Sequence, residues 1–226
     1  MNWLINNYES ILPLLLNHLK LSIIPIVLGF VIAIPLGWLA WRFRVTRGLL
    51  LTVVGLLYTI PSLALIAIFP SLLGLGYLSE TPTVIALTIY AVAIMTRSAA
   101  DAFGSVDPDV RESATAVGYG PWRRFREVEF PLAGPVLLAG IRVTAVSTIA
   151  LVTVGALFGV RSLGYFFTDG SQRHIPLEVL TGVVLTMLVA LIIDGLLVLL
   201  GRLVMPWTRS DRQARRRVAL VPEAAA

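Results

Sequence analysis

Apolar residues run along this chain in five long segments, separated by short stretches rich in charge, glycine and proline. A helix that crosses a bilayer needs about 20 mostly apolar residues. The segments that meet this requirement are Leu19–Trp41, Leu49–Phe69, Thr83–Ala100, Val136–Leu157 and Leu177–Val204. Lipid offers the backbone no hydrogen-bond partner, and the runs are too long and continuous for the strands of a barrel. The pattern therefore predicts an all-α integral membrane protein with about five transmembrane helices.

Arginine is distributed very unevenly between the two sides of this predicted bundle. Thirteen arginines fall on the side that receives the 42–48 loop, the 101–135 loop and the C-terminal tail, whereas only Arg161 and Arg173 fall on the other side. Loops that remain in the cytoplasm carry an excess of Lys and Arg. The basic side is therefore predicted to be cytoplasmic, with the N-terminus outside and the C-terminus inside, and only an odd number of spans satisfies both.

Three regions follow from these boundaries. Residues 1–18 are predicted to be a short extracytoplasmic segment at the membrane surface, since they lack the basic leader of a signal peptide. Residues 19–207 form the transmembrane domain, and residues 208–226 form a basic cytoplasmic tail whose simplest role is to anchor on anionic lipid. The chain shows no internal repeat, which weakens the case for a secondary transporter built from duplicated halves.

The composition agrees with lipid as the main solvent. Of the 226 residues, 57% are hydrophobic and 14% are charged, whereas about 25% of a soluble domain is charged. The net charge of +5 could indicate a nucleic-acid partner, but the arginines lie in short clusters between apolar runs. That arrangement is typical of loops at a membrane surface, so no nucleic-acid partner is expected. The chain has no cysteine, which excludes disulfides and thiolate metal sites.

The 101–135 loop is long for a connection between membrane helices, and its sequence predicts two short helices at an angle. Asp107 followed by proline is a helix start, because the aspartate caps the first amides and proline suits the first helical position. Gly118 is placed to end this helix in a left-handed turn. Pro121 can open the second helix, and Pro131 closes the loop at the start of the fourth span. A solvated loop whose amphipathic helices rest on lipid headgroups fits the same pattern.

Within the loop, a set of spaced residues resembles the signature of permease subunits in binding-protein-dependent ABC importers. That signature reads Glu-Ala-Ala, a glycine four residues after the last alanine, and an aliphatic-x-Leu-Pro ending after nine more. The matching residues here are Glu112, Ser113, Ala114, Gly118, Val128, Phe130 and Pro131, with Ser113 in place of the middle alanine and Phe130 in place of the leucine.

The resemblance implies a function for this loop. In that family the first helix of the loop docks in a cleft of a cytoplasmic ATPase and transmits its closure. The residues implied for this coupling are Glu112, Ser113, Ala114, Gly118, Tyr119 and Pro131. The partners implied are two cytoplasmic ATP-binding subunits, a second permease subunit that is either a copy or a paralogue, and an extracytoplasmic substrate-binding protein. The location implied is the cytoplasmic membrane of a prokaryote.

Longer stretches resemble the osmoprotectant-uptake subfamily, whose substrates include glycine betaine, carnitine, choline and proline betaine. They are YTIPSLALIAIFPSLLGLG (58–76), TVIALTIYAVAIMTRS (83–98) and LGYFFTDG (163–170), and the resemblance covers residues 19–207. It implies a path for compatible solutes. A permease for another small solute of the amino-acid type is the main alternative. A secondary transporter or channel, or a scaffold whose loop only binds lipid, are the others.

The chain lacks the residues that ATP hydrolysis requires. No GxxxxGK[ST] loop is present, and the single lysine, Lys20, lies at the outer end of a span. ATP and magnesium are therefore expected on the partner ATPase, with no cofactor and no enzymatic activity in this chain. His18 and His174 are far apart in sequence and are interpreted as loop histidines rather than metal ligands.

Three residues inside or near the spans are candidates for other functions. Pro61 could be a hinge in a helix that lines the path, or an ordinary membrane-helix proline. Asp194 is the one carboxylate deep inside a span, and it could act in the gate or path or serve as a hydrogen-bonding partner between helices, which is the favoured interpretation. Arg142 is expected to extend its side chain to the cytoplasmic surface.

Overall fold

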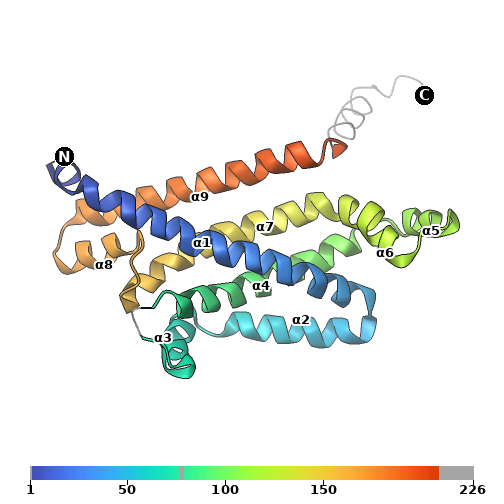
Figure 1. Ribbon diagram of the computed structural model, residues 1–226, viewed down its shortest axis with the longest axis horizontal. Coiled ribbons are helices and arrows are strands. Elements are labelled where there is room, and N and C mark those ends of the chain that lie inside the picture. The colour runs from blue at the N-terminus through green and yellow to red at the C-terminus, as the bar shows by residue number, and fades with distance from the viewer. Residues whose placement is uncertain (1, 77–78, 209–226) are drawn as a thin grey trace, which may run out of the picture.

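The computed structural model describes residues 2–76 and 79–208, and within these ranges every regular element is helical (Figure 1). This confirms the all-α class. The elements are α1 (Asn2–Arg42), α2 (Arg44–Thr59), α3 (Ser62–Leu73), α4 (Thr81–Gly104), α5 (Pro108–Ala116), α6 (Pro121–Arg124), the π-helical turn η1 (Phe125–Glu129), α7 (Phe130–Val152), the 3-10 helix η2 (Thr153–Phe158), α8 (Tyr165–Gln172) and α9 (Pro176–Val204).

Four of these segments are long and apolar enough to cross a membrane, and a bent pair of helices makes up to five. The bent pair is α2 and α3, which meet at 91°. The second predicted span, Leu49–Phe69, is therefore one segment in sequence but two helices in space. The break falls at Ile60, which has extended backbone angles. Proline disfavours the helical conformation in the residue before it, so Pro61 accounts for the position of the bend.

Helix α1 is longer than the first predicted span. It runs for 41 residues without a break and includes Pro13, Pro25 and Pro35. The predicted surface segment therefore continues the helix, and the apolar candidate span begins at Glu9. His18, expected in a loop, is fully buried instead. The sequence ILPLLL before it is itself apolar, and a membrane helix tolerates a proline such as Pro13.

The core of the bundle lies between α1, α4 and α7, with α1 packed along α4 over most of its length (Figure 1). Two glycines of α1 make this approach possible. Gly29 packs on Ala91, and Gly37 packs on Ala99 and on the backbone nitrogen of Ala100. A Cβ atom at either glycine would collide with the facing alanine. Small residues that allow backbones to approach closely are typical of helix pairs in membranes.

The two ends of the bundle carry different segments (Figure 1). The end of α1, the start of α2, the α5–α6 loop and the end of α9 gather at one end. The N-terminal end of α1, α3 and the short helix α8 lie at the opposite end. Segments that the arginine pattern assigns to the same side thus lie at the same end. Helix α8 falls in a stretch, residues 159–176, for which the sequence predicted only a loop.

Candidate functional site

The predicted short helix of the loop is present as α5, with the predicted start and stop. The Asp107 carboxylate accepts a hydrogen bond from the Asp109 amide at 2.9 Å, and proline occupies the first turn. At the other end Gly118 has a φ of +92°, a left-handed conformation that residues with a Cβ rarely adopt. The Tyr119 amide closes the turn on the Ala114 carbonyl oxygen at 3.0 Å.

Every residue of α5 is exposed or half-buried. Among the residues predicted for coupling, Glu112, Ser113 and Gly118 are exposed, whereas Ala114 and Tyr119 are half-buried. Val117, at the helix end, is an apolar side chain that remains 78% exposed. A nine-residue helix is too short to be stable in water on its own. Its position must therefore be held by contacts with the rest of the protein.

The second helix of the loop differs from the prediction. Helix α6 continues through η1 into α7, so that one helical segment extends from Pro121 to Phe158. The expectation that Pro131 closes the loop is wrong, because Pro131 is the second residue of α7. It lines an apolar cavity of about 330 Å³ between α7 and α9. The structure therefore separates Pro131 from the exposed surface of α5.

A π-helical turn takes the place of that expected break. Its widened turn is closed by a hydrogen bond from the Phe130 amide to the Phe125 carbonyl oxygen, five residues earlier. Proline has no amide to donate to a regular helical ladder, and the turn lies directly before Pro131. Single π-helical turns inside α-helices occur frequently at functional sites.

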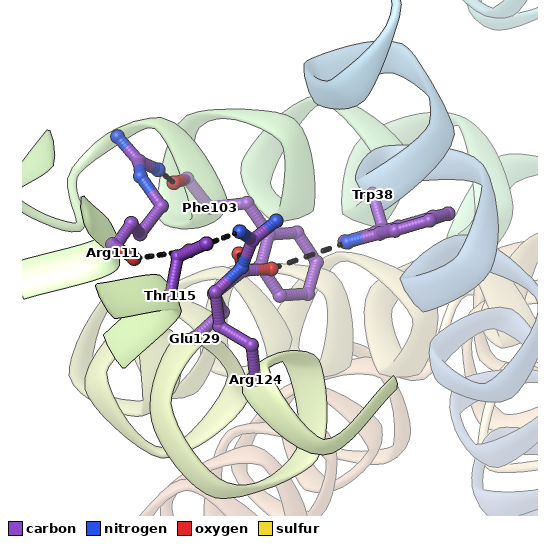
Figure 2. Close-up of polar contacts among 6 residues, drawn as sticks. All are labelled: Trp38, Phe103, Arg111, Thr115, Arg124 and Glu129. Atoms are coloured by element: carbon purple, nitrogen blue, oxygen red, sulfur yellow. Dashed lines mark hydrogen bonds and ion pairs between the residues drawn. The ribbon is translucent and has the colours of Figure 1, made fainter. Parts of the chain in front are cut away.

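A polar network behind α5 fixes it to three other helical segments (Figure 2). The Arg124 Nε donates to Glu129 Oε1 at 2.9 Å, and its Nη1 donates to Thr115 Oγ1 of α5 at 2.9 Å. The Glu129 carboxylate also accepts a hydrogen bond from Trp38 Nε1 of α1 at 3.4 Å. Arg111 of α5 donates to the Phe103 carbonyl oxygen of α4 at 3.2 Å. Helix α5 is therefore tied to α1, α4 and the start of α7.

Burial and aromatic packing reinforce this network. Only 2% of the Glu129 side chain and 20% of the Arg124 side chain are exposed. The Arg111 guanidinium lies 4.7 Å from the centre of the Trp41 ring, a cation–π geometry. The Phe125 ring packs within 6.0 Å of four other aromatic rings, those of Trp38, Phe103, Trp122 and Phe130. The rear of the loop is thus packed and paired, while the front of α5 is bare.

Sequence reasoning missed the residues of this network. It singled out Glu112 and its neighbours on the front of α5, but not Thr115, Arg124 or Glu129 behind it. Arginine and glutamate five residues apart do not face each other on an α-helix, so the spacing of Arg124 and Glu129 carried no signal. The π-helical turn brings them together, and nothing in the local sequence specifies that turn.

The two other candidates lie apart from the loop. Pro61 lies at the bend between α2 and α3, at the opposite end of the bundle from α5 (Figure 1). Asp194 of α9 accepts two hydrogen bonds from Arg142 of α7, at 2.6 and 2.7 Å. The favoured interpretation of Asp194 as a partner between helices is consistent with this pair. The expectation for Arg142 is wrong, because its guanidinium turns to this carboxylate rather than to the surface.

Among the described residues, no group of three or more His, Asp or Glu side chains lies close enough together to hold a metal ion. The residues that the structure does bring together are suited to holding a helix in place. They form no arrangement of nucleophile and base. The chemistry of this end of the bundle is therefore that of a mechanical contact.

Comparisons with known proteins agree with this. The family model described as "Binding-protein-dependent transport system inner membrane component" matches residues 26–206. The glycine betaine/carnitine/choline transport system permease protein OpuCB of Bacillus subtilis is 34% identical over 84% of this chain and 86% of its own length. The choline transport system permease protein OpuBB of the same organism is 32% identical over the same shares of the two chains. The osmoprotectant import permease protein OsmW of Salmonella typhimurium is 31% identical over 87% of this chain and 92% of its own length.

Solved structures show the same fold. A structure of the MetNI methionine ABC transporter in an inward-facing conformation superposes with a TM-score of 0.75 at 21% identity. The match covers 87% of this chain and 98% of that chain. An amino acid ABC transporter solved with histidines gives a TM-score of 0.73 at 16% identity, covering 88% and 96%.

Proposed function

The chain belongs to the family of binding-protein-dependent transport system inner membrane components, and on this premise we propose that it forms the path for quaternary ammonium osmoprotectants in an ATP-driven importer. The substrate class is supported by relatives named for glycine betaine, carnitine and choline transport. Amino acid importers share the fold at about 20% identity, which carries no substrate information. Permease membership leaves little support for the secondary-transporter, channel and scaffold alternatives.

We propose that the bare front of α5 is the surface on which the cytoplasmic ATPase docks. The observation that carries this is the contrast between its two faces: a packed and ion-paired rear, and a front where Glu112 and Ser113 are exposed. An apolar side chain as exposed as Val117, beside a rigid left-handed turn at Gly118, is suited to burial against a partner. Closure of two ATPase subunits would then push on α5, and this chain transmits the displacement.

This assignment fixes the orientation of the whole chain. The α5 end faces the cytoplasm, the end that carries α8 faces outside, and the extracytoplasmic binding protein delivers solute there. Most apolar side chains of α9 are exposed, including Leu191, Leu199 and Leu203, and such a surface is covered by lipid or by a second permease subunit. The location is the bacterial cytoplasmic membrane. ATP and magnesium are bound by the ATPase, which supplies the energy.

Two glycines two residues apart provide the experiment. Gly118 requires positive φ, whereas Gly120 has extended angles, φ −67° and ψ 163°, and a Cβ at either position meets open space. Valine strains the backbone at Gly118 but not at Gly120, where the following proline already favours the extended conformation. We expect Gly118→Val to abolish uptake while the chain still inserts, and Gly120→Val to transport normally.

The assay is uptake of radiolabelled glycine betaine, choline and carnitine, with methionine and histidine as amino acid controls, in a strain that lacks the native chain. Immunoblots of the membrane fraction normalise each variant to the amount inserted. Normal uptake by the Gly118→Val variant would refute the role of the α5 turn. Uptake of an amino acid in place of the quaternary ammonium solutes would refute the substrate class and leave the docking proposal intact.

A further inference from the structure

Helix α5 has only a few ties through which it can move the rest of the protein. It is joined covalently to α4 and α6, and the polar contacts of its side chains with other segments come from Arg111 and Thr115. Arg111 ends on a backbone oxygen of α4. Thr115 ends on the guanidinium of Arg124, which in turn holds the buried Glu129. The second tie alone reaches the helix that continues into span α7.

We propose that Arg124 is the positioning residue that passes displacement of α5 to α7 and α1, an inference that rests on the docking function proposed above. Its guanidinium is planar and rigid, and two different nitrogens bind Thr115 and Glu129 (Figure 2). The hydroxyl of Thr115 simultaneously donates to the Arg111 carbonyl oxygen at 2.9 Å. A shift of α5 therefore pulls on one end of a stiff group whose other end is fixed to the first turn of the span.

Glu129 divides this displacement between two spans. One carboxylate oxygen binds Arg124 and the other accepts the hydrogen bond from Trp38 of α1. Glu129 precedes the first residue of α7, and Trp38 lies near the end of α1. Since only 2% of the Glu129 side chain is exposed, water competes weakly for these bonds and the geometry of the unit is maintained.

The neighbouring pair of Arg123 and Glu127 shows what a different role looks like. These residues are four apart, as is usual on an α-helix, and their atoms are 3.0 Å apart. Their side chains are 60% and 46% exposed, and such surface pairs contribute little. The Arg123–Glu127 pair joins residues of one helical segment, whereas Arg124 joins α5 to that segment. The chain thus contains a matched control one residue away.

The π-helical turn is part of this arrangement. On a regular α-helix, residues five apart point in directions roughly 140° apart, at 3.6 residues per turn. The wider turn over Phe125–Glu129 reduces that angle and places Glu129 behind Arg124. The turn therefore serves to present a buried carboxylate to an arginine that also contacts the loop.

The test compares Arg124→Lys, Thr115→Val and Arg123→Lys in the full importer reconstituted in liposomes. Lysine keeps the charge that Glu129 requires but cannot hold two partners in a fixed fork, and valine removes only the hydroxyl of Thr115. We expect both variants to lower the solute transported per ATP hydrolysed by about tenfold, the weight of one hydrogen bond to a charged group. The double variant should be no worse than either single variant, because both break the same bridge, and Arg123→Lys should be unchanged.

Two further readouts make the outcomes decisive. The amount of ATPase that copurifies and the basal rate of ATP hydrolysis should be normal in all variants, because Arg124 and Thr115 act behind the docking surface. Normal transport per ATP in the Arg124→Lys and Thr115→Val variants would overturn the inference while leaving docking intact. Failure of the unmodified chain to retain the ATPase would instead overturn the proposed function. Additive losses in the double variant would show that the two residues act separately, which also contradicts the inference.

Discussion

The close packing of α1 on α4 gives a prediction whose size can be worked out from the structure. A Cβ added at Gly37 would lie 2.9 Å from the Ala100 nitrogen and 3.0 Å from the Ala99 carbonyl carbon. Carbon atoms in contact are normally about 3.5–4.0 Å apart. The Gly37→Ala substitution therefore forces α1 and α4 apart by about 0.5–1 Å, a gap that removes a quarter to a half of the attraction between facing atoms.

The expected net effect is a loss of stability despite a better helix former. Overpacking of a close contact costs about 1–3 kcal/mol, and alanine in place of glycine gains about 0.8–1 kcal/mol of helix propensity. The free energy of unfolding should therefore fall by about 1–2 kcal/mol. Gly55 is the matched control, because a Cβ there meets open space in the interior of α2. Gly55→Ala should raise the free energy of unfolding by up to about 1 kcal/mol.

The assay is reversible unfolding of the purified chain in mixed micelles with increasing sodium dodecyl sulfate, followed by circular dichroism. Adding Ala99→Gly to the Gly37→Ala variant should recover part of the loss, because it removes the facing Cβ but leaves the backbone contact with Ala100. A Gly37→Ala variant as stable as Gly55→Ala would show that α1 and α4 are not in close contact. The packing described for the core would then be wrong.

Two further predictions concern the ion pairs of the chain. Asp194→Asn should lower the amount of inserted protein, because it leaves the Arg142 charge inside a span without its carboxylate; Arg142→Gln added to it should restore insertion, as measured by membrane-fraction immunoblot. At the opposite end of the bundle from α5, the hydrogen bond from Lys20 holds the pKa of Glu80 below its usual range. This pair therefore stabilises the chain above the ordinary carboxyl pKa of about 4.3 and is lost as the pH falls through the lowered value. Because both side chains are more than a third exposed, Glu80→Gln should remove no more than about 1 kcal/mol of acid-dependent stability, and a thermal unfolding series from pH 7 to pH 3 equal to that of the unmodified chain would contradict this.

Much of the fold could be predicted because membrane helices have a simple hydrophobic signal. The third and fifth apolar segments match α4 and α9 within a few residues. The start of α1 was placed too late, because Pro13 was taken as a limit although membrane helices accommodate proline. The bend at Pro61 was expected only as a hinge, and its 91° angle depends on packing that the sequence does not display.

The front of the loop could be predicted and its rear could not. Asp107 and Gly118 have local conformational roles that follow from their residue type, and both behave as expected. Glu129 binds Trp38, which is 91 residues away, and its pairing with Arg124 depends on a π-helical turn. Contacts of this kind arise from tertiary packing, so composition and spacing along the chain contain no sign of them.

The measurement that tests the central proposal most directly is cross-linking from single cysteines, which the absence of native cysteine makes straightforward. Ser113 on the front of α5 and Ser171 on α8 are both exposed serines, at opposite ends of the bundle. In the assembled importer, a photoreactive reagent on Ser113→Cys should cross-link to the ATPase, and the same reagent on Ser171→Cys should not. Cross-links from Ser113→Cys to lipid alone, or its labelling by a membrane-impermeant reagent added outside intact cells, would contradict the account.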